Sequence, residues 1–138
     1  MPQLSEEIGR GILRVRRLIM HEAERRLAAR GESILSLQVL GCLSKLGPLS
    51  QGELAQSAGQ HPTGMSRLLD ELEQARLVRR GRDRSDRRRV MVEATARGLS
   101  HLAEHQPLVE EAFDEVLAPL LPGERRVLRD LLRRVLEK

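Results

Sequence analysis

The sequence predicts a mostly α-helical fold with one small β-hairpin. Apolar residues recur at steps of three and four along most of the chain, which is the spacing of amphipathic helices. Glycines and prolines divide this pattern into separate helices. An arginine-rich segment with strand-like alternation interrupts it between residues 79 and 98. At 138 residues, the chain can form a single domain with its own core.

The first two helices are long and separated by a glycine. Apolar residues at helical spacing predict an amphipathic helix over residues 4–29, which Gly31 ends. Ser33 is a suitable N-cap for a second helix, which ends at Gly47 and Pro48.

Two shorter helices follow. Ser50 and Glu53 have the spacing of a capping box, so we expect a third helix from there through Ser57. Pro62 occupies the first position of a fourth helix that reaches about Ala75. Two helices joined by a tight, glycine-containing turn form a helix-turn-helix, whose second helix enters the major groove of DNA. The candidate readers of base edges on that helix are Thr63, Ser66 and Arg67.

The interrupting segment predicts a charged hairpin, or wing. Val78, Val90 and Val92 supply strand residues, and the turn-forming residues of 81–86 lie between them. Residues 79–89 include seven arginines, each of which could displace counterions from a polyanion. The alternative is a solvated run of charge, but such runs usually lack strand periodicity. We therefore expect a winged helix-turn-helix core.

The C-terminal part predicts two more helices. A long helix begins near Leu99, with a kink expected at Pro107, and Pro119 and Pro122 end it. A last helix covers about 123–137. Its apolar stripe is too wide for one small neighbour and comprises Val127, Leu128, Leu131, Leu132, Val135 and Leu136.

We expect that stripe to pack against a second copy of the chain. The predicted organisation is a single unit over 1–138, in which residues 33–98 form the DNA-binding region and residues 1–30 and 99–138 form a helical dimerisation region.

Charge and composition favour duplex DNA as the partner. The net charge of +4 indicates an acidic partner. Tyr and Trp are absent and Phe113 is the only aromatic residue, so the chain lacks stacking platforms for single strands. No segment has the length and apolarity of a membrane span or signal peptide, and a lone cysteine suits a reducing compartment. The sequence thus predicts a cytoplasmic protein without a membrane partner.

The motifs resemble those of the MarR-type winged helix-turn-helix transcriptional regulators. The resemblance is strongest over residues 83–88 of the wing, and residues 48–55 and 62–73 also match family positions in the same order. It implies a triangular homodimer on a pseudo-palindromic operator. It also implies that Arg88 enters the minor groove and that Asp86 orients it, which agrees with the attraction of a narrow groove for guanidinium.

Residues and resemblance together predict a DNA-binding surface. Its members are Ser50, Gln51, His61, Thr63, Ser66, Arg67, Arg82, Arg84, Asp86, Arg87 and Arg88. Some positions depart from the family pattern. His61 replaces a small capping residue, Gly64 replaces a hydroxyl-bearing one, and Ala94 replaces a leucine beneath the wing. We therefore expect a looser start of the recognition helix and a looser wing junction.

The resemblance also implies a small aromatic or lipophilic effector in a cleft between the dimer helices and the winged region. Arg17, His21 and Ser36 are the candidate effector residues. Cys42 could sense oxidants, but its position between Leu40 and Leu43 favours a buried structural cysteine.

His101 and His105 stand four residues apart and could share a metal, with Glu104 and His21 as further ligands. Surface histidines are the preferred interpretation, so no metal and no cofactor is predicted. The sequence contains no nucleophile-base pair or phosphate loop, and we expect no enzymatic activity.

The function predicted from sequence is sequence-specific regulation of transcription, as a homodimeric repressor that an effector releases from its operator. Two alternatives remain open. One is an architectural or weakly specific DNA-binding protein without an effector, and the other is a winged helix whose basic hairpin binds an acidic protein.

Overall fold

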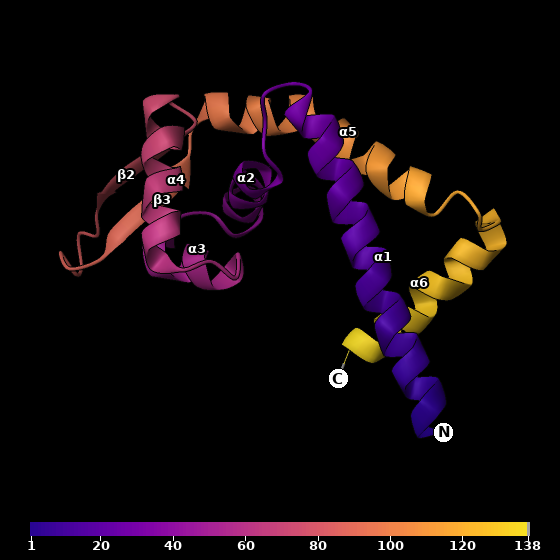
Figure 1. The fold of residues 1–138 in the computed structure, drawn as a ribbon. Coiled ribbons are helices and arrows are strands. Elements are labelled where there is room, and N and C mark those ends of the chain that lie inside the picture. Colours follow the sequence, from indigo (N-terminus) through magenta and orange to yellow (C-terminus); the bar gives the residue numbers. More distant parts are fainter. Residues whose placement is uncertain (138) are drawn as a thin grey trace.

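The computed structural model describes residues 1–137 and confirms the predicted fold class. Figure 1 shows a winged unit, formed by the elements from α2 to β3, at one side of the molecule. The helices α1 and α6 lie at the other side, and α5 runs from the winged unit toward them. In chain order the elements are α1 Pro2–Ala28, α2 Ile34–Leu46, β1 Leu49–Ser50, α3 Gln51–Ser57, α4 Pro62–Gln74, β2 Val78–Arg82, β3 Val90–Ala94, α5 Ala96–Val116 and α6 Pro122–Leu136.

The helices begin and end at the capping residues and glycines that the sequence analysis identified. Ser33 caps α2, as predicted, because its side chain accepts a hydrogen bond from the backbone N–H of Ser36. Gly31, Gly47 and Gly59 all have positive φ angles, and each lies just beyond a helix end. Pro107 lies inside α5, which continues through it and bends along its course in Figure 1.

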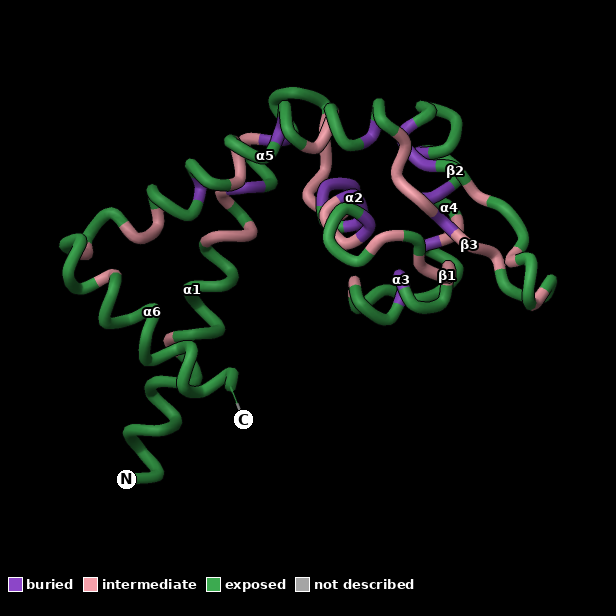
Figure 2. The backbone as a smooth tube through the Cα atoms, turned by 180° about the vertical axis from the view of Figure 1, so that it is seen from behind, coloured by how far each residue is buried: buried purple, intermediate pink, exposed green. Residues whose placement is uncertain are grey.

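The core lies inside the winged unit. Leu40 of α2, Leu54 of α3, Met65 and Leu69 of α4 and Val92 of β3 are all fully buried. Figure 2 shows the same distribution, with buried segments concentrated in the winged unit and few along α1 and α5. The apolar stripes of the short helices therefore meet one another and one face of the sheet, which fixes the position of α4.

The sheet has a third strand that the sequence did not predict. The strand order is β1-β3-β2, with antiparallel pairing throughout. In β1, Leu49 pairs with Val92 and Ser50 with Met91. Two residues are too few to show strand periodicity, so only the pairing with β3 reveals this strand.

The junction between the wing and α5 is tightly packed. A Cβ on Gly98 would lie 2.0 Å from the backbone oxygen of Leu77, so only glycine fits there. Thr95 caps α5 by accepting from the backbone N–H of Gly98, and its hydroxyl donates to the carbonyl of Arg76. Arg76 has a positive φ of 64°, a conformation that residues other than glycine rarely adopt. The looser junction expected from Ala94 is therefore offset by these backbone contacts.

The helices α1 and α5 pack along each other outside the winged unit. Arg26 of α1 connects them through ion pairs with Glu111 at 3.0 Å and with Glu115, and it also contacts Glu22. Among residues 1–137, no helix combines the length and apolar character needed to cross a membrane.

The outer helices leave large apolar side chains uncovered. No residue of α6 is buried, and Val127, Leu128, Leu131, Leu132 and Val135 are all exposed. Further exposed apolar residues lie on α1, namely Leu4, Ile8, Ile12, Leu13, Val15 and Leu18. Isolated apolar residues on a surface are ordinary, but continuous stripes of this kind mark an interaction face.

Candidate DNA-binding surface

The recognition helix α4 begins at a well-formed cap. His61 is the N-cap residue, and its Nδ1 accepts from the backbone N–H of Thr63 at 3.2 Å. Pro62 occupies the first turn, where no backbone N–H is needed. The imidazole of His61 therefore supplies the acceptor that a small polar residue usually provides, and the looser start expected from Gly64 stays a prediction.

The predicted reading face of α4 is accessible. Thr63 and Arg67 are exposed, and Ser66 is half-buried. Gln51 and Ser50 are half-buried at the start of α3, where the Ser50 hydroxyl accepts from the backbone N–H of Glu53 at 3.1 Å. The Glu53 side chain pairs with Arg89 of the wing, so it also holds α3 against the hairpin.

The wing tip is an ordered turn over residues 83–89. The Asp83 carboxylate accepts from the backbone N–H of Ser85 at 3.1 Å and from its hydroxyl at 3.0 Å. The hydrogen bond from the Ser85 backbone lowers the pKa of Asp83. The Asp83 backbone N–H also donates to the carbonyl of Arg89 at 3.0 Å, which closes the turn.

Arg88 projects from this turn into solvent. Its side chain is 93% exposed, and its Nε lies 3.4 Å from Oδ1 of Asp86. The same carboxylate oxygen accepts from the Arg88 backbone N–H at 3.0 Å. The predicted partnership of Asp86 and Arg88 is present, and it runs through the Nε atom and the backbone N–H of Arg88. Among residues 1–137, the terminal nitrogens of Arg88 have no hydrogen-bond or ion-pair partner, so they are available to an external one.

The seven arginines of the wing are not equivalent. The expectation that each could displace counterions is wrong for Arg80, whose guanidinium binds Asp70 and Glu73 and whose side chain is only 19% exposed. Arg79 pairs with Glu93, and Arg89 with Glu53. Arg82 donates to the carbonyl of Arg87 at 3.1 Å. Within residues 1–137, Arg84 and Arg87 form no ion pair, so they remain available together with Arg88.

Sequence reasoning missed the structural role of Arg80. It joins β2 to the recognition helix, because Asp70 and Glu73 both belong to α4. The hydrogen bond that Arg80 donates to the Asp70 carboxylate is the main cause of the raised pKa of Arg80. The acids of α4 and the first arginines of the wing could have suggested such a pair. The sequence does not show, however, which acid each arginine contacts. This contact adds a polar link between α4 and the wing to the packing of their apolar residues in the core.

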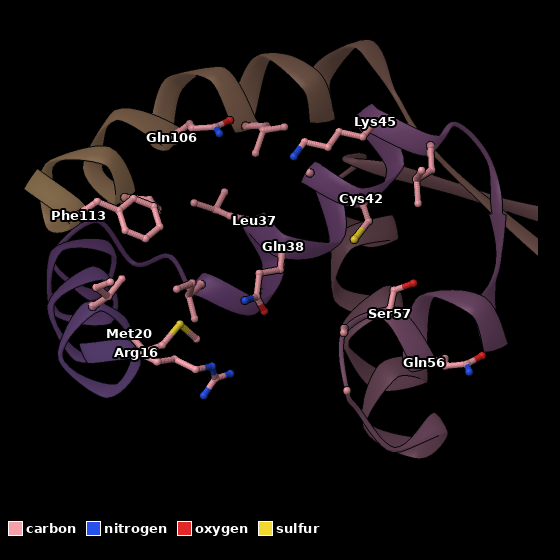
Figure 3. A pocket seen from close by; sticks show the side chains of 18 of the residues that line it. Arg16, Met20, Leu37, Gln38, Cys42, Lys45, Gln56, Ser57, Gln106 and Phe113 are labelled. Carbon is pink, nitrogen blue, oxygen red and sulfur yellow. The ribbon is translucent and has the colours of Figure 1, made fainter. Parts of the chain in front are cut away.

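A cleft of about 980 Å³ lies between the outer helices and the winged unit. Its walls are mostly apolar, and Figure 3 shows Arg16, Gln38 and Lys45 among the polar side chains around it. None of the three predicted effector residues lines it. Arg17 and His21 are exposed elsewhere on α1. Ser36 is buried, and its hydroxyl oxygen lies 3.0 Å from that of Ser33. Cys42 is half-buried and lines the cleft, which corrects its expected burial in the core.

The expectation of two surface histidines on α5 is also wrong. His105 is buried and His101 is half-buried, and both lie beside Glu32. The further ligands suggested from sequence, Glu104 and His21, are exposed and do not belong to this cluster.

The capped recognition helix, the three-stranded sheet and the basic tip together define a winged helix-turn-helix protein. Residues 33–89 match the model of the MarR family. A Bacillus subtilis (strain 168) protein described as the uncharacterized HTH-type transcriptional regulator YcgE is 31% identical over 103 residues. That match covers 74% of this chain and 66% of the relative, slightly less than two thirds of its length. Over residues 33–89, which form the winged core, the chain is therefore similar to the MarR family.

Solved structures share the fold at lower identity. Wild-type MarR from E. coli superposes with a TM-score of 0.87 at 24% identity, over 93% of this chain and 95% of that one. A mutant of the same protein in complex with operator DNA gives a TM-score of 0.77 over 94% of each chain. BpsR from Bordetella bronchiseptica, solved in a study of DNA-binding regulation by 6-hydroxynicotinic acid, gives 0.78 at 21% identity, over 95% and 99%.

Proposed function

We propose that the chain regulates transcription as a homodimer that binds a pseudo-palindromic operator in duplex DNA. The observation that carries this proposal is the joint exposure of Arg67 on α4 and of Arg84, Arg87 and Arg88 on the wing. Figure 1 shows the hairpin beside α4, so both elements can contact one duplex. The recognition helix would occupy the major groove and Arg88 the adjacent minor groove.

Dimerisation would follow from the uncovered apolar faces of α1, α5 and α6. In this proposal residues 33–98 bind DNA, and residues 1–30 and 99–138 hold two copies together. Two-fold symmetry would then place two recognition helices on successive turns of a duplex, about 34 Å apart. The crystal structure of an E. coli MarR mutant with operator DNA supports binding of this fold to duplex DNA.

The test of DNA binding is a competition experiment on the promoter beside the chain's own gene. We expect footprinting to show a protected pseudo-palindrome, with random duplex competing at least about 10³-fold less well. Equal competition by random duplex would favour the architectural alternative, and binding to acidic protein without DNA binding would favour the interaction module.

We further propose that the chain is a repressor and that an aromatic carboxylate bound in the cleft releases the operator. The cleft is apolar enough for an aromatic ring, and Arg16 and Lys45 supply cations for a carboxylate. It also lies between the outer helices and the winged unit, so an occupant would change the spacing of the recognition helices.

The effector test uses 6-hydroxynicotinic acid and benzoate as probes, read by thermal shift and by operator release. A tenfold loss of operator affinity corresponds to about 1.4 kcal/mol of coupling. Arg16→Ala should weaken that response, whereas Arg17→Ala, on the adjacent residue outside the cleft, should leave it intact. If both probes leave thermal stability and operator affinity unchanged, the result would favour a DNA-binding protein that has no aromatic carboxylate effector.

A further inference from the structure

Three potential metal ligands meet where the connection between α1 and α2 passes α5. Glu32 lies in that connection, and His101 and His105 occupy successive turns of one face of α5. One ligand atom from each of the three residues lies within 4.8 Å of the other two. The sequence separates Glu32 from the histidines by about seventy positions, so only the fold brings them together.

The orientation of His105 is fixed by the backbone. Its Nδ1 lies 2.9 Å from the carbonyl oxygen of His101. A carbonyl can only accept, so Nδ1 carries the proton and Nε2 of the neutral ring keeps a free lone pair. Metal-binding histidines are commonly held in this way, with the second ring nitrogen donating to a carbonyl. The side chain is also buried, with 7% of its surface exposed, which excludes a merely solvated role.

His101 presents an unsatisfied nitrogen to the same place. Its Nε2 is buried and has no hydrogen-bond partner within the described structure, although Oε1 of Glu32 lies 3.1 Å away. The carboxylate oxygen is therefore close to the ring nitrogen but out of line for a hydrogen bond. A buried Nε2 facing a carboxylate oxygen is unfavourable unless a cation lies between them, which is either a proton that completes an ion pair with Glu32 or a metal ion that both atoms ligate.

We propose that Glu32, His101 and His105 form a binding site for a divalent transition metal, with Zn²⁺ as the preferred ion. Two imidazoles and one carboxylate are ligands that Zn²⁺ accepts, with a water molecule in the fourth position. Tetrahedral ligands at about 2.0–2.2 Å from zinc stand roughly 3.3–3.5 Å apart, so the widest gap must close by at most about 1.5 Å. Rotation of the Glu32 side chain, which lies outside the helices, together with small changes in the χ angles of the two histidines, would supply that movement.

Metal binding at this site would fasten the end of α1 to α5. The bound ion is present only in the folded chain, so it stabilises the fold in proportion to its concentration and affinity. This inference does not depend on DNA binding, because both the site and its test concern the chain without DNA.

The experiment titrates purified full-length chain with Co²⁺, which reports its coordination by visible absorption, and then displaces Co²⁺ with Zn²⁺. We expect one ion per chain and a Co²⁺ absorption spectrum typical of four-coordinate geometry. Zn²⁺ should also raise the midpoint temperature of unfolding. The test variants are Glu32→Gln and His101→Gln, which keep side-chain size and are checked for folding by circular dichroism. Each should weaken Zn²⁺ binding by at least about 10-fold, since even the loss of a residue that only hydrogen-bonds to a zinc ligand costs about 10- to 100-fold.

Matched controls separate this site from adventitious binding. Glu104→Gln on α5 and His21→Gln on α1 alter the same residue types at exposed positions outside the cluster. Both controls should bind as the wild type does. The proposal is overturned if the wild type takes up no Co²⁺ at equimolar micromolar concentration, or if the cluster variants bind the ion as tightly as the controls.

Discussion

Arg88 is the residue on which the proposed wing contact depends most directly. Its guanidinium is almost fully exposed and is only lightly engaged by Asp86. We expect Arg88→Ala to weaken operator binding by about 1–3 kcal/mol and to reduce the salt dependence by about one charge, because one groove contact is lost. Salt-dependent fluorescence anisotropy measures both quantities. Arg79→Ala removes a wing arginine that already pairs with Glu93 and serves as the control, with a smaller expected effect.

Arg67 should behave differently, because it lies on the recognition helix. A residue in the major groove can read a base edge, whereas a wing arginine reads charge and groove width. We expect Arg67→Ala to reduce binding to the operator more than binding to random duplex. Parallel titrations on the two duplexes check this prediction. An equal loss on both would show that Arg67 contacts only phosphate.

At the scale of the element, the ion pairs of Glu22 within α1 carry a pH signature. Hydrogen bonding from Arg25, with a further contribution from Arg26, lowers the pKa of Glu22 from 4.5 to about 2. A carboxyl group whose pKa is lowered in the folded state stabilises the fold above its unfolded pKa and loses that contribution as pH falls through the folded value. Glu22→Gln should therefore be less stable than the wild type at neutral pH, and the difference should vanish between about pH 4.5 and pH 2.

Urea unfolding at several pH values and one fixed chain concentration measures this difference. A fixed concentration is needed because self-association would also change apparent stability. Glu7→Gln, at an exposed position of the same helix, should show no comparable dependence on pH. A constant gap between wild type and Glu22→Gln across this range would contradict the prediction.

At the scale of the whole molecule, the uncovered face of α6 leads to a prediction about assembly. Each apolar side chain that a dimer buries contributes roughly 1.5–3 kcal/mol. Leu128→Asp combined with Leu132→Asp should therefore dissociate the proposed dimer. Operator affinity should then fall far more than the loss of one half-site contact, because the two recognition helices are no longer linked.

Light scattering at micromolar concentration measures the oligomeric state, and anisotropy measures operator affinity. The control combines Arg129→Ser with Arg133→Ser, which lowers the net charge by the same two units at polar positions of α6. It should remain dimeric. A wild-type chain that is monomeric at this concentration, or a monomeric variant that still binds the full operator tightly, would refute the proposed assembly.

Local chemistry in the sequence determined the helices and the hairpin. Caps such as Ser33 and Ser50, stops such as Gly31 and Gly47, and the apolar spacing act within a few residues, so their effects can be read directly. The two-residue β1 could not be read, because it exists only through pairing with β3.

The partners of charged residues depended on tertiary structure. The sequence located the wing arginines, but only the fold engaged Arg80 with α4 and left Arg84, Arg87 and Arg88 available. It also placed Arg16 rather than Arg17 at the cleft and joined Glu32 to the histidines of α5. Long flexible side chains can reach many neighbours at similar cost, so their pairing follows from the relative placement of whole elements, which the hydrophobic core decides.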